Sequence, residues 1–192
     1  VLHCRTSMTA YTHEGVLVVP TCFLTSIEMD SSYSLASAGL TVSTAFSYHG
    51  IWMAHSDEAR IKMLEHANQA LQLDKTNIMA RYARAFAYFW GGEYERSAAE
   101  IERAVECNPN DYHTVCLKGW ILTYSGQLEE GLQCTTDAMR TNPLAADSCL
   151  EIIGTGEYLS GNYDQALHAF GKMKSEGFHK LGGLAASYAQ MG

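Results

Sequence analysis

The sequence predicts an all-α protein built from stacked pairs of antiparallel helices. Three similar stretches predict it: GEYERSAAEI begins at Gly92, GQLEEGLQCT at Gly126 and GNYDQALHAF at Gly161. Their starting glycines recur at a nearly constant interval of about 34 residues. Two of the three prolines, Pro109 and Pro143, recur at the same interval. A period of this size is typical of proteins in which each repeat is one helical hairpin packed on the next.

The first helix of each repeat is predicted by a largely apolar run. These runs cover approximately residues 78–90, 112–124 and 147–159. A turn precedes the second and third, because Pro109 and Pro143 cannot continue a helix and push the preceding residue toward extended geometry. Each run is followed by glycine, which readily takes the positive φ of a helix terminus.

The second helix of each repeat begins with acidic residues such as Glu93 and Asp164. Negative charge at this end of a helix complements the helix dipole. We expect these helices to end near Ala104, Ala138 and Met173. Because one helix pair cannot bury its apolar face alone, the pairs should stack.

This pattern resembles the tetratricopeptide repeat, which has the same period of about 34 residues. The family's small, glycine, aromatic and proline positions recur in three sets, which are Ala85, Tyr88, Gly92, Tyr94, Ala104 and Pro109; Gly119, Leu122, Gly126, Leu128, Gly131, Ala138 and Pro143; and Gly154, Gly161, Tyr163, Ala166 and Phe170. The resemblance implies a right-handed superhelical solenoid of antiparallel helix pairs. Small residues such as Gly119 and Ala138 would let helices approach closely, and large ones would fill the space between repeats.

The resemblance divides the chain into six segments. They are an N-terminal segment at 1–33 that includes the end of a preceding repeat helix, a repeat at 34–77 with an insertion loop at 47–57, repeats at 78–111, 112–146 and 147–177, and the first helix of an incomplete repeat at 178–192. The insertion SYHGIWMAHSD places Trp52 and Met53 in a loop. These two side chains either fold back onto the first helices or contact a second chain or domain.

In this family the first helices line a concave surface that binds partners. The residues that the resemblance places there are Tyr82, Phe86, Phe89, Trp90, His113, Cys116, Trp120, Tyr124, Glu151 and Tyr158. Helical spacing independently puts Tyr82, Phe86 and Phe89 on one face. Phe86 can equally belong to the core. We expect partial exposure of Trp90, Trp120, Tyr124 and Tyr158, since tyrosine and tryptophan suit surfaces that are wet at one end and dry at the other.

The chemistry of these positions predicts the kind of partner. One subclass of the family binds carboxylate ends of chaperone tails through inward Lys and Asn, but here those places hold Tyr82, Phe86, Cys116 and Trp120. A protein or peptide that presents an apolar segment fits better. We expect Trp120→Ala to weaken partner binding while costing less stability than added bulk at Gly119 or Ala138.

Composition argues against other classes of partner. The net charge of −8 disfavours nucleic acid and anionic membranes, which need clustered Lys and Arg. No window is long and apolar enough for a membrane span. The six cysteines form no CxxC pair, which indicates reduced thiols in a cytoplasmic protein.

Motifs of catalysis are not found. The sequence contains no GxSxG and no HExxH, and GTGEYLSG at 154–161 follows the repeat rather than a strand. His113 and Cys116 could share a metal ion, but a site needs further ligands, so we predict no metal, cofactor or catalytic residue. The acidic residues Glu100, Glu102 and Glu106 are expected to form a solvated face.

A narrower resemblance concerns the parent protein. The strings IEMDSSYSLASAGLTVSTAFSYHG and MRTNPLAADSCLEIIGTGEYLSGNYDQALHAF are similar to repeat arrays attached to bacterial adenylate or guanylate cyclases and transcription regulators. This implies a regulatory segment of a larger bacterial protein. One alternative is an oligomerisation scaffold, a homodimer paired through incomplete ends near Leu184 and Tyr188. Another is an enzyme with a pocket around His113 and Cys116.

Overall fold

The computed structural model of the chain describes residues 23, 25–29, 36, 39, 57–141 and 146–192. Within these ranges the regular elements are α-helices. The chain forms two compact units, Val1–Asn108 and Pro109–Gly192. The expectations for residues 1–22 and for the loop that carries Trp52 and Met53 lie outside the described residues.

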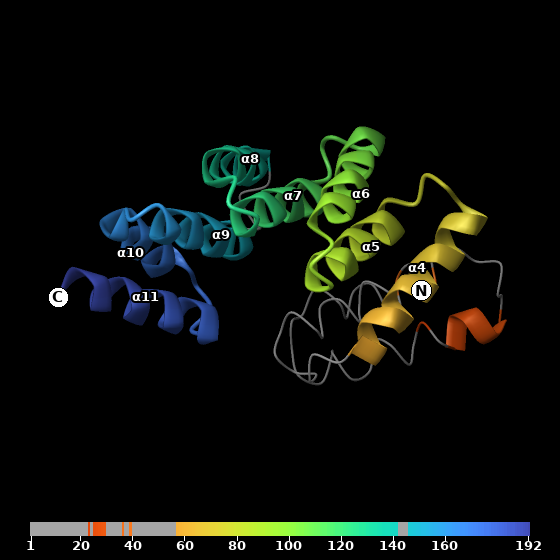
Figure 1. The fold of residues 1–192 in the computed structure, drawn as a ribbon, viewed down its shortest axis with the longest axis horizontal. Helices are drawn as coiled ribbons and strands as arrows, with labels where there is room; N and C mark the ends of the chain where they lie inside the picture. The colour runs from red at the N-terminus through yellow and green to blue at the C-terminus, as the bar shows by residue number, and fades with distance from the viewer. Residues whose placement is uncertain (1–22, 24, 30–35, 37–38, 40–56, 142–145) are drawn as a thin grey trace. The chain divides into compact units, whose positions relative to one another are not determined.

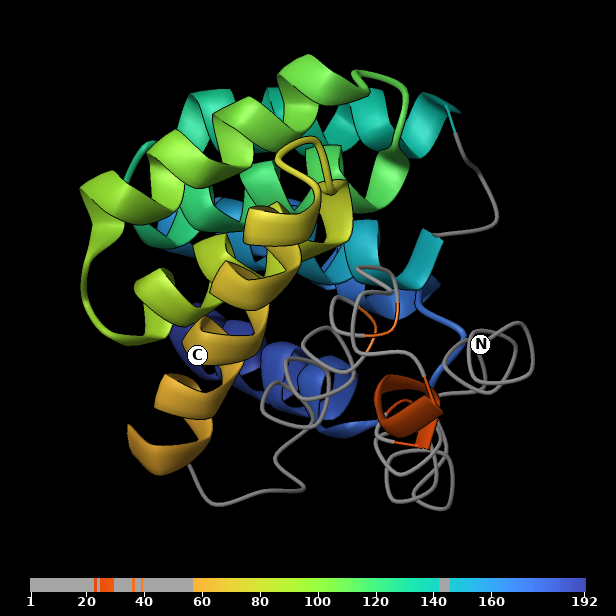
Figure 2. The same cartoon turned by 90° about the vertical axis from the view of Figure 1, so that its right-hand side faces the viewer.

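The first unit contains α4 (Asp57–Leu73), α5 (Ile78–Trp90) and α6 (Tyr94–Cys107). Helix α5 packs between the other two, against α4 on one side and as an antiparallel pair with α6 on the other (Figures 1 and 2). Helix α5 begins at Asn77, whose side chain accepts a hydrogen bond from Ala80 N at 3.1 Å. A cap of this kind satisfies one of the amides that a helix N-terminus leaves unpaired.

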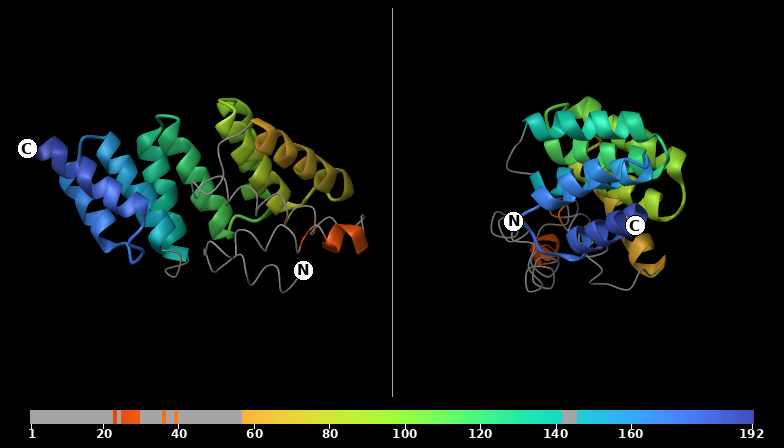
Figure 3. Two further views of the ribbon diagram at one scale, coloured as in Figure 1. Left: turned by 90° about the horizontal axis from the view of Figure 1, so that it is seen from below. Right: turned by 90° about the vertical axis from the view of Figure 1, so that its left-hand side faces the viewer.

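The second unit contains α7 (Tyr112–Tyr124), α8 (Leu128–Thr141), α9 (Ala146–Leu159), α10 (Tyr163–Lys172) and α11 (Phe178–Met191). Helices α7 and α8 form one pair, α9 and α10 form the next, and α11 lies against both α10 and α9 (Figures 1 and 3). The first helices of the repeats agree within one residue with the ranges expected from sequence. The predicted all-α solenoid of antiparallel helix pairs is confirmed.

The glycine turns share one backbone geometry. Gly92, Gly126 and Gly161 have φ of 74°, 86° and 80°, in the left-handed region that glycine takes without strain. In each turn the amide after the glycine donates to a carbonyl five residues earlier, as Glu93 N does to Tyr88 O at 2.9 Å, Gln127 N to Leu122 O at 2.9 Å and Asn162 N to Glu157 O at 2.8 Å. This motif satisfies carbonyls at the end of the first helix and reverses the chain into the second.

Helices α7 and α8 approach most closely where two glycines face each other. A Cβ atom on Gly119 would collide with the hydroxyl of Thr135 and lie 3.1 Å from Gly131 O, while one on Gly131 would lie 2.8 Å from Thr123 N. Ala138, one turn beyond Thr135, is fully buried. The sequence-based expectation that small residues permit this close contact is therefore confirmed at Gly119.

The expected solvated acidic face on α6 is wrong for Glu100, which is buried. Its carboxylate lies 2.6 Å from Arg84 Nη2 and 3.2 Å from Arg81 Nη1, both on α5, and 2.6 Å from Arg103 Nη1 on its own helix. Burial opposes ionisation of this carboxyl, but the three guanidinium groups outweigh it and lower the pKa of Glu100. A charge pattern along α6 alone cannot show that α5 supplies these arginines.

Candidate functional site

A pocket of about 290 Å³ opens between α9 and α11 in the second unit. Its lining residues are Glu151, Thr155, Tyr158, Phe170, Phe178, His179, Gly182, Gly183 and Ala186. The ring of Phe170 is buried against two glycines, since Cβ atoms on Gly154 of α9 and Gly183 of α11 would lie 2.8 Å and 2.5 Å from it. Phe170 therefore sets the spacing of the two helices that form the walls.

One face of α9 forms one wall of the site. Asp147, Glu151, Thr155 and Tyr158 follow helical spacing of three to four residues and so share this face. The Asp147 carboxylate accepts hydrogen bonds from the backbone amides of Lys174 at 2.9 Å and Ser175 at 2.8 Å, and these bonds hold its pKa low against the opposing effect of burial. The contact fixes the segment that enters α11 and thereby positions the start of that helix.

A carboxylate–imidazole pair occupies the wall of the pocket. Nδ1 of His179 lies 3.1 Å from Oε1 of Glu151. The Glu151 side chain is 14% exposed, and burial raises its pKa to about 7. Burial also lowers the pKa of His179. Burial therefore disfavours the ionised form of both side chains.

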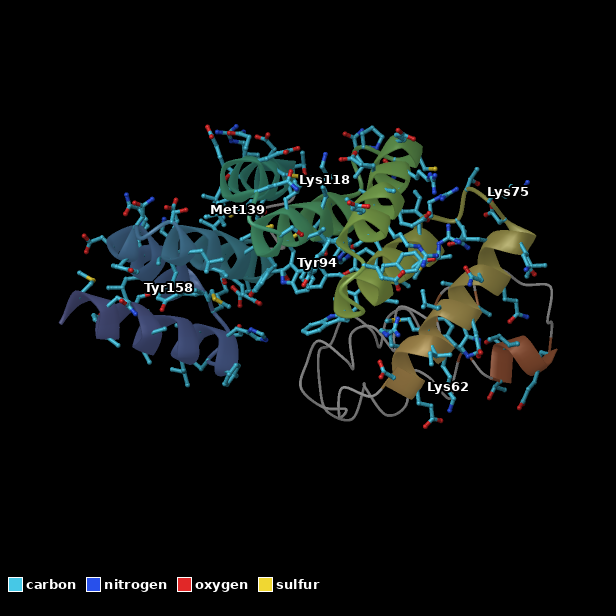
Figure 4. All side chains as sticks on the ribbon, in the orientation of Figure 1. Lys62, Lys75, Tyr94, Lys118, Met139 and Tyr158 are labelled. Atoms are coloured by element: carbon cyan, nitrogen blue, oxygen red, sulfur yellow. The ribbon has the colours of Figure 1, made fainter. Side chains whose placement is uncertain are left out.

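Tyrosines extend this surface on either side of the pair. Tyr124 of α7 is 44% exposed, and its hydroxyl shares a hydrogen bond with Thr155 of α9. Tyr158 lies between α9 and α11 (Figure 4), where its ring is 5.6 Å from that of Tyr163 and its hydroxyl accepts a 3.5 Å contact from Gln190 Nε2. The surface thus combines aromatic rings with a few polar atoms.

The structure separates the expected site residues of the second unit into two groups. Glu151 and Tyr158 line the pocket, and Tyr124 and His113 are exposed on α7, where His113 packs against the ring of Tyr112 at 3.9 Å. The other group, Cys116 and Trp120, is buried.

The expectation that Trp120 is partly exposed is wrong, since it is 6% exposed. Cys116 lies 3.5 Å from Cys149 across the α7–α9 contact, and Trp120 follows one turn later on the same face. Its ring packs 4.9 Å from that of Tyr124. The expected order of stability effects changes with this position, because Trp120→Ala would leave a large core cavity.

The expected residues of α5 belong to the first unit. Phe86 and Phe89 are buried, Tyr82 is half-buried and Trp90 is exposed at the end of the helix. Trp90 contacts both phenylalanine rings edge-on, at 6.1 Å from Phe86 and 6.0 Å from Phe89. Phe86 and Phe89 are therefore core residues, and Trp90 is the exposed edge of their cluster.

Sequence reasoning missed the residues that α11 contributes to the pocket. A signal for them was present, because Gly192 can be aligned with Gly161 as the glycine that ends a first helix. The same alignment carries Glu151, which was expected on the binding surface, onto Gly182, and both residues line the pocket. Phe178 aligns with Asp147, which is not among the expected surface residues.

The part of the chain that the structure describes contains neither a metal-binding cluster nor a helix that could span a membrane. No group of three or more His, Cys, Asp or Glu side chains there could hold a metal ion, and the candidate pair His113 and Cys116 gains no third ligand. None of the described helices is both long enough and apolar enough to cross a membrane.

Comparison with solved structures assigns the fold. The thermophilic TPR protein TTC0263 of Thermus thermophilus superimposes with a TM-score of 0.74 over 97% of this chain and 96% of its own, at 12% identity. The fold is that of the tetratricopeptide repeat. YrrB, described as a TPR protein with an unusual peptide-binding site, shares this fold with a TM-score of 0.57 over 92% of this chain and 87% of its own, at 19% identity.

A longer protein also contains the tetratricopeptide-repeat fold in a matching region. The human IFIT1 dimer with PPP-AAAA gives a TM-score of 0.72 at 16% identity, and the match covers 92% of this chain but 42% of IFIT1. No model of a protein family and no curated protein sequence matches this chain. The likeness therefore concerns the tetratricopeptide-repeat fold.

Proposed function

We propose that this chain is a protein-interaction module that holds a peptide segment of a partner protein in the pocket between α9 and α11. The observation that supports it is the pocket itself, which lies between two first helices and is lined by aromatic rings and one carboxylate–imidazole pair. Concave sites with mainly apolar walls and a few convergent polar groups are the usual form of a binding site.

The pocket matches a partner that presents an apolar side chain. Its volume of about 290 Å³ suits one or two side chains rather than a whole folded element. Tyr158 and Phe178 supply rings at the walls, and Phe178 is 71% exposed. Burial of such rings against a partner's apolar residue would provide most of the binding free energy, as at other interface anchors.

A matched pair of glycine substitutions tests the proposal. Gly182 lines the pocket and Gly171 of α10 does not, and neither has another atom near the position of an added Cβ. Gly182→Leu should therefore fill the pocket without disturbing the fold, whereas Gly171→Leu adds the same side chain elsewhere. Both changes raise helix propensity, so both variants should be at least as stable as the wild type.

The assay uses peptides selected from a random library against the wild-type chain, with affinity measured by fluorescence polarisation. We expect at least a tenfold weaker affinity for Gly182→Leu and an unchanged affinity for Gly171→Leu. Equal affinity of both variants, or failure to select any peptide, would overturn the proposal.

Nucleic acid is not part of the proposed function, although IFIT1 was solved with PPP-AAAA. The chain carries 21 acidic and 13 basic residues, and the pocket contains a carboxylate rather than clustered Lys and Arg. We expect a fluorescein-labelled A₄ RNA with a 5′-triphosphate to show no saturable binding at 150 mM salt.

The proposal extends to the parent protein. The resemblance to arrays attached to bacterial cyclases and transcription regulators supports a regulatory segment of a larger bacterial, cytoplasmic protein. Reading the gene on both sides of this sequence tests that extension. A neighbouring catalytic or DNA-binding domain supports it, and a secreted protein without such a domain contradicts it.

The second candidate is an oligomerisation scaffold, favoured by the outer surface of α11. Leu181, Tyr188 and Met191 are large apolar side chains that α11 leaves exposed outside the pocket. Leu184 is only partly available, because it packs against Leu150, Ala166, Phe170 and Met173. Light scattering over a dilution series distinguishes a stable dimer from a monomer.

A further inference from the structure

Two free cysteines lie in contact inside the second unit. Sγ of Cys116 on α7 is 3.5 Å from Sγ of Cys149 on α9, and both side chains are buried. They are 33 residues apart in the sequence, so the repeat brings equivalent turns of successive first helices together. The proposed peptide pocket does not use either sulfur.

The geometry is close to that required for a covalent bond. A disulfide has an S–S length of about 2.05 Å, so the two sulfurs need to approach by roughly 1.5 Å. Side-chain rotation and a small shift of α7 against α9 can supply that movement. Other described cysteines are less well placed, since Cys107 is exposed on α6 and Cys134 makes its 3.4 Å contact with Val115 O.

The two thiols have different chemical roles. When one proton is lost, the Cys116 thiol donates a hydrogen bond to the Cys149 sulfur, which lowers the pKa of Cys149. The same hydrogen bond, together with burial, raises the pKa of Cys116 well above its ordinary value. Loss of the first proton is therefore favoured at Cys149 while Cys116 keeps its proton, which suits attack by one sulfur followed by disulfide closure through the other.

We propose that Cys116 and Cys149 form an oxidation site that hydrogen peroxide converts into a disulfide linking α7 to α9. The Cys149 thiolate attacks one peroxide oxygen, the O–O bond breaks, and hydroxide leaves and takes up the proton that Cys149 released. The Cys116 sulfur then attacks the sulfenic sulfur, the S–S bond forms, the S–O bond breaks, and the hydroxyl leaves as water with the proton of Cys116. Two thiols lose two electrons, and one peroxide becomes two waters.

The size of the oxidant matters because both sulfurs are buried. Hydrogen peroxide is close to water in size and can reach them during small openings of the α7–α9 contact. A bulky aromatic disulfide reagent such as dithionitrobenzoate cannot. The site thus distinguishes peroxide from larger thiol-reactive molecules.

The disulfide would stabilise the part of the unit that carries the pocket. A bond across 33 residues removes conformational freedom from the unfolded chain, and it ties α7 to the helix that supplies Glu151. We expect the midpoint of thermal unfolding to rise by about 5–10 °C on oxidation, and dithiothreitol to reverse the rise. This inference does not depend on peptide binding.

A tryptic map of the oxidised full chain tests the proposal. In a Cys107→Ser background, cleavage after Arg103, Lys118, Arg140 and Lys172 gives peptides 104–118, 119–140 and 141–172, each with a single cysteine. After treatment with hydrogen peroxide and capping of free thiols with N-ethylmaleimide, we expect 104–118 linked to 141–172, with 119–140 carrying the maleimide. The intact mass should first fall by 2 Da.

Matched variants identify the two sulfurs that react. Cys134→Ser should retain the 2 Da loss and the rise in unfolding temperature, whereas Cys116→Ser and Cys149→Ser should lose both. Circular dichroism confirms that each variant is folded, and the map of the Cys107→Ser chain stands even if one further variant does not fold. Linkage through peptide 119–140, or free thiols at both Cys116 and Cys149 after peroxide, would overturn the proposal.

Discussion

The Glu151 carboxylate and the His179 imidazole lie 3.1 Å apart, brought together from α9 and α11 at the wall of the pocket. Neither residue is near the other in sequence. Their contact depends on Phe170, which fixes the spacing of these two helices, and on Asp147, which holds the segment leading into α11. The contact between the two side chains therefore depends on how α9, α10 and α11 pack together.

The raised pKa of Glu151 predicts a dependence of stability on pH. Burial moves this pKa from 4.5 to about 7. Between these two pH values, the folded chain holds a proton on Glu151 that the unfolded chain has released. The stabilisation is fully present below about pH 4.5 and is lost as the pH rises through 7. Between pH 5 and pH 8 we expect the wild type to lose about 2–3 kcal/mol of unfolding free energy relative to Glu151→Gln.

Urea titrations of both proteins at pH 5, 6, 7 and 8 measure this difference. His179 on α11 and Tyr124 and Cys116 on α7 also face Glu151, but both proteins contain them. Their own titrations largely cancel when the two curves are subtracted. Parallel curves for wild type and Glu151→Gln would show that Glu151 is ionised in the fold throughout this range.

The close contact between α7 and α8 predicts a large effect of one methyl group. Gly119→Ala places a Cβ against Thr135 and Gly131, and overpacking of this kind costs about 1–3 kcal/mol, which outweighs the gain in helix propensity. Gly171→Ala on α10 is the matched control, because nothing lies within 4 Å of its Cβ. It should stabilise the chain by up to about 1 kcal/mol. Chemical denaturation gives both values, and stabilisation by Gly119→Ala would contradict the glycine contact.

The buried cluster around Glu100 predicts a loss of stability when its charge is removed. Glu100→Gln leaves Arg81 and Arg84 of α5 without their shared carboxylate, which should cost about 2–4 kcal/mol, somewhat less than in a fully buried pair. Because the pKa of Glu100 is lowered in the fold, this contribution is present above about pH 4.5 and is lost as the pH falls through the folded pKa.

The exposed residue Glu106 on the same helix provides the control for that experiment. Glu106→Gln should change the unfolding free energy by less than about 0.5 kcal/mol, as surface substitutions usually do. Thermal unfolding at pH 7 compares the two variants. Equal melting temperatures would show that the contacts between Glu100 and the three arginines do not stabilise the fold.

The outer face of α11 predicts how the scaffold alternative can be decided. Tyr188 is 63% exposed, so Tyr188→Asp should leave the fold and the pocket intact. If the chain is an interaction module, light scattering should give a monomer for both proteins at micromolar concentration. A wild-type dimer that becomes monomeric in Tyr188→Asp would instead establish α11 as a homodimer interface.

The sequence determined the order of the repeat helices and the bounds of the first helix in each repeat, whereas α6 and α8 end at Cys107 and Thr141, beyond the expected ends near Ala104 and Ala138. Apolar runs, acidic starts and glycine stops act within a few residues of one another, and the structure places α5, α7 and α9 within one residue of the expected ranges. The close packing at Gly119 followed as well, because a small residue at a repeated position lets two helices approach closely. These features depend on local backbone geometry and on periodic spacing, both of which can be read from the linear sequence.

The tertiary structure decided which side of each helix is covered. Helical spacing puts Cys116, Trp120 and Tyr124 on one face of α7. Trp120 is nevertheless buried and Tyr124 is exposed, because the burial of a side chain depends on where the neighbouring helices end. Likewise Glu100 is buried because α5 brings arginines to it, and Glu151 is part of a pocket because α11 brings His179. Burial and pairing are properties of several segments at once, so no single stretch of sequence contains them.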